Sequence, residues 1–273
     1  MVKDKSLLRI LFFGDVVGRP GRKGIAQALP EILQSFPADL VMANIENAAH
    51  GKGITESTLV ELERAGVNVF TSGEHIYDKW RDSDPETLFD KFPTLLKPAN
   101  FSPDRPGRSE VIFKTAKGNV LVLSLIGQVF FRYQNLSPWT MLEEILNRHR
   151  EEDLAAIVLD FHAEATSEKN ALARHFDGKL SAVLGTHTHI PTADAQILRS
   201  GTAFVTDVGM NGPKDSVIGM KSEVSIQRFL TGEKITYEIA ETKEVWLNYV
   251  ELSINPETQK SVSIEHKHKI INI

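Results

Sequence analysis

The chain contains short, almost continuous runs of apolar residues, and a polar residue or a glycine follows most of them. Runs this short, apolar at successive positions, are typical of strands that are covered on both faces. They predict strands, in chain order, at Leu8–Phe13, Leu40–Ile45, Val67–Phe70, Val120–Ile126, Ala155–Leu159, Ala182–Leu184 and Ala203–Val205.

Amphipathic stretches with helical periodicity lie between these strands. In one of them, Glu56–Ala65, Thr55 is the predicted N-cap and Gly66 the predicted stop. In another, Lys23–Phe36, Pro30 is expected to produce a kink. The other two predicted helices are Met141–Glu151 and Ser167–His175. Because strands and helices alternate, the pattern predicts an α/β sandwich.

The end of the chain has a different pattern. Glu244–Ile254 and Val262–Ile271 alternate apolar and polar residues, with Pro256-Glu257-Thr258 between them, which predicts a two-stranded hairpin. This hairpin is either an assembly surface for a homo-oligomer or a sheet edge. Because no repeat, low-complexity tract or long linker divides the chain, we expect a single domain over residues 1–273.

Composition narrows the chemistry. The chain has 273 residues and no cysteine, which excludes disulfides, thiolate metal sites and cysteine nucleophiles. A net charge of −5 argues against a stable nucleic-acid complex, since such binding needs clustered Lys and Arg. No apolar stretch approaches the roughly 20 residues that span a bilayer. We therefore expect a soluble, cytoplasmic protein.

Polar residues that can bind metal follow five of the predicted strands. Since the carboxyl ends of parallel-type strands open onto a shared crevice, we expect these side chains to converge. In chain order they are Asp15, then Glu46 and Asn47, then Glu74 with His75, then His162, and finally His187 with His189.

The composition of this group favours a metal site. His187 and His189 taken alone fit either a metal site or two solvated histidines. A buried group of acidic, amide and imidazole side chains is different, because without a cation each uncompensated charge costs several kcal/mol. The number of donors is too large for one ion and suits two ions that share a bridging carboxylate.

Several longer segments resemble the YmdB-type branch of the calcineurin-like metallophosphoesterases. They occur in the family's order and cover most of residues 8 to 220; the ten-residue segment around His162 is the most specific. They are Gly14-Asp15-Val16-Val17-Gly18, Glu46-Asn47-Ala48-Ala49-His50-Gly51-Lys52-Gly53, Pro98-Ala99-Asn100, Asp160-Phe161-His162-Ala163-Glu164-Ala165-Thr166-Ser167-Glu168-Lys169, Gly185-Thr186-His187-Thr188-His189 and Thr206-Asp207-Val208-Gly209-Met210.

The resemblance implies a four-layer αββα sandwich and a bacterial cytoplasmic phosphodiesterase for cyclic nucleotides, with two iron or manganese ions. Residue by residue, it implies that the first ion is held by Asp15, Glu46, Asn47 and His189. Glu46 would bridge to a second ion held also by Glu74, His162 and His187. His75 would be the general acid, which suits an imidazole with an ordinary pKa near 6.5.

One residue departs from the family. Where members generally have Gly-Asn-His, this chain has Gly73-Glu74-His75, so a neutral ligand is replaced by a carboxylate. If Glu74 is a ligand, the ions are better neutralised and acidify bound water less, which would change metal preference or reduce turnover. The alternative is that Glu74 turns away and the second site is weak.

These features predict a dinuclear-metal phosphodiesterase that cleaves 2′,3′- or 3′,5′-cyclic nucleotides by attack of a hydroxide held between the ions. The same centre would suit a phosphomonoesterase or nucleotidase, and Glu74 leaves open a metal-bearing regulatory nucleotide-binding protein with little turnover. His50 either contacts substrate or is structural. Glu164 is expected at the start of the next helix, and Lys52 and Lys79 either steer an anionic substrate or are solvated.

Overall fold

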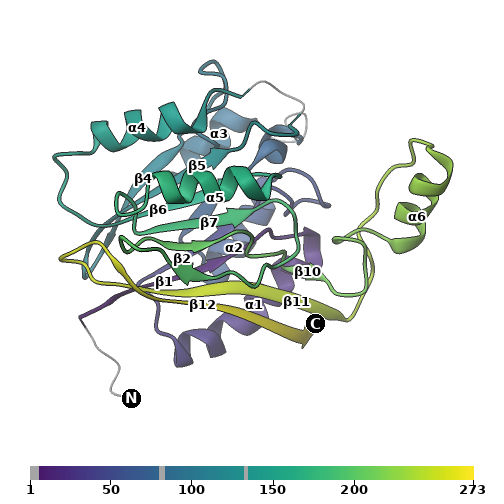
Figure 1. Cartoon of the computed structure of the whole chain (residues 1–273). Helices are drawn as coiled ribbons and strands as arrows, with labels where there is room; N and C mark the ends of the chain where they lie inside the picture. The colour runs from purple at the N-terminus through teal and green to yellow at the C-terminus, as the bar shows by residue number, and fades with distance from the viewer. Residues whose placement is uncertain (1–5, 80–83, 132–134) are drawn as a thin grey trace.

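The computed structural model describes residues 6–79, 84–131 and 135–273, which form two β-sheets packed face to face, with helices on the outer faces (Figure 1). The first five residues of the expected 1–273 range lie outside this description. The predicted αββα sandwich is confirmed. Within the described residues, no helix is both long and apolar enough to cross a membrane.

The first sheet has six strands in the order β10-β11-β1-β2-β3, with β12 paired to β11. The strands β1, β2 and β3 are parallel, whereas β11 is antiparallel to β1. The predicted hairpin is therefore part of this sheet, and β12 is at its edge. The bounds are β1 Leu8–Phe13, β2 Leu40–Asn44, β3 Val69–Thr71, β10 Gly212–Pro213, β11 Glu244–Ile254 and β12 Ser261–Asn272.

The second sheet also has six strands, in the order β4-β5-β6-β7-β9-β8. The four central strands are parallel, and an antiparallel strand closes each edge. The bounds are β4 Glu110–Thr115, β5 Gly118–Ile126, β6 Leu154–His162, β7 Ala182–Thr186, β8 Gln196–Ile197 and β9 Ala203–Val205.

Helices cover the outer face of each sheet. The helices α1 (Gly18–Ser35) and α2 (Glu56–Ala65) pack on the first sheet, and α4 (Pro138–Arg148) and α5 (Thr166–His175) pack on the second. The remaining helical segments are the 3₁₀ turn η1 (Glu74–Tyr77), α3 (Pro85–Lys91) and α6 (Ser222–Thr231). In Figure 1, α6 projects away from both sheets.

The continuous apolar runs are explained by burial on both faces. In β1, Leu8, Ile10 and Phe12 pack between the sheets. The alternate residues Leu11 and Phe13 pack in the core beneath α1 and α2. Each fully buried side chain of this size contributes about 1.5–3 kcal/mol to folding. The two sheets therefore bring their strand ends to a common edge, where the candidate ligands lie.

The boundaries differ from the prediction where polar residues are buried or apolar residues exposed. Strand β6 continues past Leu159 to His162, because Asp160 and His162 pair in the ladder with β5 and β7. Helix α1 begins at Gly18 rather than Lys23. The pattern missed β4, η1, α3 and α6; in α6 only Ser225 is buried, so there is no apolar face to detect.

Candidate metal centre

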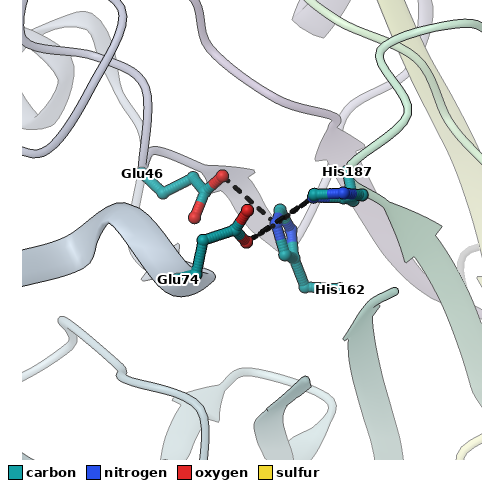
Figure 2. A group of neighbouring side chains, drawn as sticks. All are labelled: Glu46, Glu74, His162 and His187. Carbon is teal, nitrogen blue, oxygen red and sulfur yellow. Dashed lines mark hydrogen bonds and ion pairs between the residues drawn. The ribbon is translucent and has the colours of Figure 1, made fainter. Parts of the chain in front are cut away.

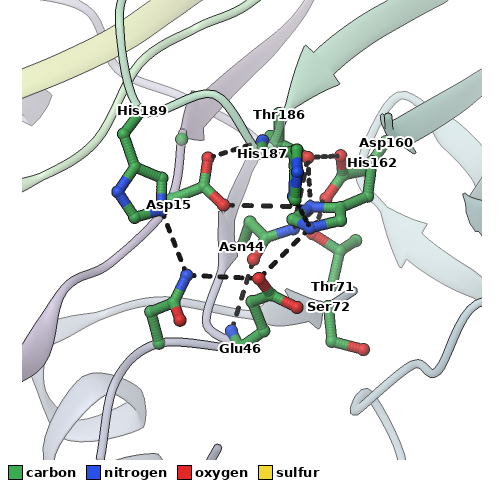
Figure 3. A network of polar contacts seen from close by, with 12 residues as sticks. Asp15, Asn44, Glu46, Thr71, Ser72, Asp160, His162, Thr186, His187 and His189 are labelled. Carbon is green, nitrogen blue, oxygen red and sulfur yellow. Dashed lines mark hydrogen bonds and ion pairs between the residues drawn. The ribbon is translucent and has the colours of Figure 1, made fainter. Parts of the chain in front are cut away.

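The carboxyl ends of strands from both sheets deliver the candidate ligands to one place (Figures 2 and 3). Asp15 follows β1, Glu46 follows β2, and Glu74 begins the 3₁₀ turn after β3. From the second sheet, His162 ends β6 and His187 follows β7. Residues far apart in sequence thus meet because parallel strands present their carboxyl ends at the same edge.

Four of these side chains form a tight cluster, shown in Figure 2. Glu46, Glu74, His162 and His187 each offer a ligand atom, and these atoms lie within 4.8 Å of one another. His162 Nε2 is 2.9 Å from Glu74 Oε2 and 3.1 Å from Glu46 Oε1. His187 Nδ1 is 3.0 Å from His162 Nε2. Two carboxylates and two imidazoles are a donor set suited to first-row divalent metals.

The other three predicted ligands adjoin this cluster. Asn47 Nδ2 is 3.2 Å from Glu46 Oε1 and 3.2 Å from His189 Nε2. Asp15 is fully buried; its Oδ2 accepts a hydrogen bond from the His187 backbone N–H (3.0 Å). Its other oxygen, Oδ1, lies 3.8 Å from His162 Nδ1 and has no hydrogen-bond partner among the described residues. A buried carboxylate oxygen without a donor fits an absent cation.

The charges in the cluster stabilise one another. Burial alone would raise the pKa of Glu46, but the adjacent His162 outweighs it and the net pKa is lowered. Burial likewise opposes a lowered pKa for Glu74, yet hydrogen bonds with His162 and His187 prevail. In the reverse direction, burial would lower the pKa of His162, but Glu46 and Glu74 raise it well above its ordinary value. A proton on His162 thus supplies positive charge that a cation would otherwise supply.

A buried polar network behind the cluster orients His162 (Figure 3). Thr186 Oγ1 donates to Asp160 Oδ1 (2.7 Å) and lies 2.9 Å from His162 Nδ1. Because that hydroxyl proton is used, Thr186 Oγ1 accepts from His162 Nδ1–H, which leaves Nε2 facing the carboxylates. Asp160 also accepts from Asn44 Nδ2 (2.8 Å) and from Thr71 Oγ1. Burial, only partly offset by His162 and these donors, raises the pKa of Asp160 to about 6.

This network was not predicted from the sequence. Asp160 was recognised only as part of a motif, and Asn44, Thr71 and Thr186 were not considered. The available signal was an aspartate inside an apolar strand, since such a residue needs several donors around it. Its partners come from strands of both sheets, which no local pattern identifies.

His75 lies at the open side of the cluster. Its backbone N–H donates to Glu46 Oε2 (2.9 Å), and its ring Nδ1 is 2.9 Å from Asp78 Oδ2. Its Nε2 is 3.8 Å from Glu74 Oε1. Burial would lower the pKa of His75, but the Asp78 bond and the charges of Glu46 and Glu74 raise it. The imidazole is therefore held by one nitrogen and can hold a proton on the other.

Two residues that the sequence left open now have positions. Glu164 precedes α5, whose N-cap is Ala165, and its Oε2 is 3.0 Å from His187 Nε2. It therefore contacts a candidate ligand as well as beginning the helical segment. His50 has a positive φ of 56° and lies in a groove beside the cluster, not in the cavity directly over it.

A cavity of about 420 Å³ opens over the cluster. One side is polar and is formed by candidate ligands together with His75, Lys52 and Glu164. The other side is formed by the segment that carries α6, through Val217, Ile218, Met220, Ser225, Phe229 and Tyr237. The cavity therefore joins a charged floor to an apolar and aromatic wall.

Gly73 gives the cluster the room that it needs. A Cβ at this position would lie 2.2 Å from His162 Cδ2 and 2.4 Å from Glu46 Oε2, which is too close for any real contact. We expect Gly73→Ala to destabilise the protein by about 1–3 kcal/mol, the usual effect of overpacking. It should also lower the metal content, as measured by elemental analysis beside a thermal melt. A variant that melts like the wild type and retains its metal would contradict this geometry.

Solved structures identify the class of fold. The structure matches a phosphatase from Mycoplasma pneumoniae with a TM-score of 0.90 and 33% identity, covering 97% of this chain and 94% of that chain. It also matches the NAD nucleotidase of Haemophilus influenzae with a TM-score of 0.53, covering 98% of this chain and 56% of that chain; at 14% identity this likeness concerns the fold alone. The fold is of the metallophosphoesterase and 5′-nucleotidase type.

Sequence comparison is more specific. The profile of the family described as YmdB-like protein matches residues 11–266. The chain is also 41% identical over 258 residues to the 2′,3′-cyclic-nucleotide 2′-phosphodiesterase of Bacillus subtilis, covering 94% of this chain and 96% of that protein. The chain belongs to the YmdB-like protein family, as the resemblance implied.

Proposed function

We propose that this protein is a dinuclear-metal phosphodiesterase that hydrolyses 2′,3′-cyclic nucleotides. The observation that carries the proposal is the cluster of carboxylate and imidazole ligand atoms within 4.8 Å of one another, beside the unpartnered Asp15 Oδ1. The choice of the 2′,3′-cyclic substrate is supported by the name of the Bacillus subtilis relative. The absence of cysteine suits a reducing cytoplasm, where we propose that the enzyme acts.

The seven converging side chains divide into two sets. Asp15, Asn47 and His189 would hold one ion, Glu74, His162 and His187 would hold the other, and Glu46 lies between the sets and would contact both. Iron and manganese suit such oxygen and nitrogen donors. When bound, two ions supply a hydroxide at neutral pH and neutralise charge on the phosphate.

The chain's own residues would then orient the substrate and move one proton. A water oxygen bonds to phosphorus, the P–O2′ bond breaks, and the 2′ oxygen leaves with a proton, giving a 3′-phosphomonoester. His75 would donate that proton from Nε2, since Asp78 engages its Nδ1. The raised pKa of His75 keeps the imidazole protonated at neutral pH, as an acid must be before it acts.

A substrate panel in the presence of manganese tests the proposal. We expect hydrolysis of 2′,3′-cyclic AMP and bis-p-nitrophenyl phosphate, but not of p-nitrophenyl phosphate; 3′,5′-cyclic AMP shows whether the other cyclic isomer is also accepted. Cleavage of the monoester alone would instead indicate a nucleotidase of the same fold. If two metals bind per chain but no substrate turns over, the protein is a regulatory nucleotide-binding protein.

Glu74 provides a prediction about the acidity of the centre. The residue faces the cluster, with Oε2 2.9 Å from His162 Nε2 and 3.5 Å from His187 Nδ1. We expect Glu74→Gln to move the acidic limb of the kcat/KM profile to lower pH, because removing one negative charge makes bound water more acidic. Glu74→Asp keeps the charge and should leave that limb in place. Identical profiles and metal content for all three proteins would mean that Glu74 has no special role.

A further inference from the structure

A basic groove adjoins the cavity over the cluster. It has a volume of about 610 Å³ and is lined by Lys52, Lys79, Arg228 and Lys234, together with His50 and Tyr237. These cationic residues come from three separate parts of a chain whose net charge is −5. Such local concentration of positive charge in an acidic protein favours an anionic ligand at this place.

The groove is continuous with the cavity. Lys52, Met220 and Tyr237 line both, and the cavity alone extends down to Glu46 and Glu74. The order of chemical groups along this path is therefore the metal cluster, an apolar and aromatic wall, and a basic groove. The segment that carries α6 supplies both the wall and part of the groove, and Figure 1 shows how it projects from the sheets.

The aromatic wall contains a hydroxyl that lacks a partner. Ser225 is 2% exposed and lines the cavity, yet its Oγ has no hydrogen-bond partner within the described ranges. An unpaired buried hydroxyl costs about 1–3 kcal/mol, which a ligand with a polar edge would recover. Phe229, 84% exposed, and Tyr237 lie on the same wall. Aromatic faces beside one hydroxyl suit a nucleoside, whose base stacks and whose polar edge bonds.

Tyr237 links the wall to the groove. The Arg228 guanidinium lies 4.2 Å from the centroid of its ring, and an Arg228 Nη1–H donates to the carbonyl of Ile235. Arg228 is thereby fixed in place with positive charge at the border of the two spaces. Alternating aromatic and cationic groups are typical of surfaces that follow a single nucleic-acid strand.

We propose that the preferred substrate is a short oligoribonucleotide that ends in a 2′,3′-cyclic phosphate. This inference rests on the proposed function. The cyclic phosphate would lie on the metal cluster, the terminal nucleoside on the wall of Ser225, Phe229 and Tyr237, and the phosphate on its 5′ side in the basic groove. DNA cannot form this end because it lacks the 2′-hydroxyl. The reaction is the same hydrolysis, which leaves a 3′-phosphate on the strand.

The test compares two substrates, 2′,3′-cyclic AMP and the dinucleotide ApA with a 2′,3′-cyclic phosphate end. The dinucleotide has one more phosphate, which should occupy the groove and lower KM several-fold in dilute buffer. Neutralising one single-strand phosphate makes binding vary with salt to a power of about −0.7, so this advantage should fall about fivefold between 50 and 500 mM salt. Equal KM values at low salt would overturn the proposal.

Lys234→Glu probes the groove, because the exposed Lys234 lines it but not the catalytic cavity. We expect the ratio of the two KM values to fall to about one. Lys114→Glu is the matched control with the same charge change; Lys114 is on β4 opposite Asn119, at the start of β5 and far from the strand carboxyl ends. A ratio that survives Lys234→Glu would place the second phosphate elsewhere and overturn the assignment.

Binding measured without turnover separates this inference from the proposed function. A fluorescent tetra-adenylate with a 3′-phosphate should bind the wild type at low salt and bind Lys234→Glu several-fold more weakly, by anisotropy. If neither cyclic substrate is hydrolysed but this dependence on Lys234 remains, the groove is supported and the proposed function fails. No binding to the wild type, or binding only to phosphatidylglycerol vesicles, would overturn the oligonucleotide assignment.

Discussion

Replacing His75 with alanine is expected to lower kcat by about 10²–10⁴, the range typical for losing a general acid. The metal content should stay at the wild-type value, because the predicted ligands do not include the His75 imidazole. Its ring is held at the cavity by Asp78, with Nδ1 2.9 Å from Asp78 Oδ2. The measurement is steady-state hydrolysis of 2′,3′-cyclic AMP with elemental analysis of the same preparation.

Leaving-group acidity makes this test sharper. A p-nitrophenolate leaves without a proton more readily than a ribose oxygen, so His75→Ala should be impaired less on bis-p-nitrophenyl phosphate than on 2′,3′-cyclic AMP. His175→Ala is the matched control, since the His175 side chain is 54% exposed on α5. A His75→Ala enzyme that remains fully active on the cyclic nucleotide would refute the acid assignment.

Glu46→Ala is expected to have the largest effect on both metal binding and rate. Glu46 is 1% exposed and lies between the two sets of ligands, within 3.1 Å of His162 and 3.2 Å of Asn47. Its loss should reduce the metal content below two ions per chain. The contribution of metal ions to such reactions is several kcal/mol, so kcat/KM should fall by about 10³-fold or more.

Two further variants separate charge from packing at this position. Glu46→Gln keeps the shape and an oxygen that can accept the His75 N–H, but removes the charge, so it should lose metal as Glu46→Ala does. Glu143→Ala, at a 55% exposed side chain on α4, removes a carboxylate elsewhere and should change neither quantity. Full metal occupancy in both Glu46 variants would rule out a bridging role.

The sequence predicted those parts of the fold that repeat a simple physical rule. The apolar runs of β1 and β7 were recognisable because both faces of these strands are buried. The ligand positions followed from the same strands, since polar residues at parallel strand ends share one edge. The geometry brings together all seven residues predicted as ligands, and their binding of metal is now a proposal with tests.

Other parts depended on contacts between distant residues that no local pattern records. The Asp160 network draws Asn44 and Thr71 from the first sheet and Thr186 from the second. Helix α6 has exposed apolar residues such as Phe229, so the usual amphipathic signal is absent. Net charge was equally uninformative about the basic groove, because Lys52 and Lys234 come together only in the fold.

The most direct test of the central claim is a crystal structure with manganese, with anomalous differences collected at the manganese edge. The account predicts two peaks about 3.5–4 Å apart, the usual spacing of such pairs. Glu46 should lie between them, with Asp15, Asn47 and His189 around one and Glu74, His162 and His187 around the other. A single peak, peaks away from these side chains, or no peak in saturating manganese would contradict it.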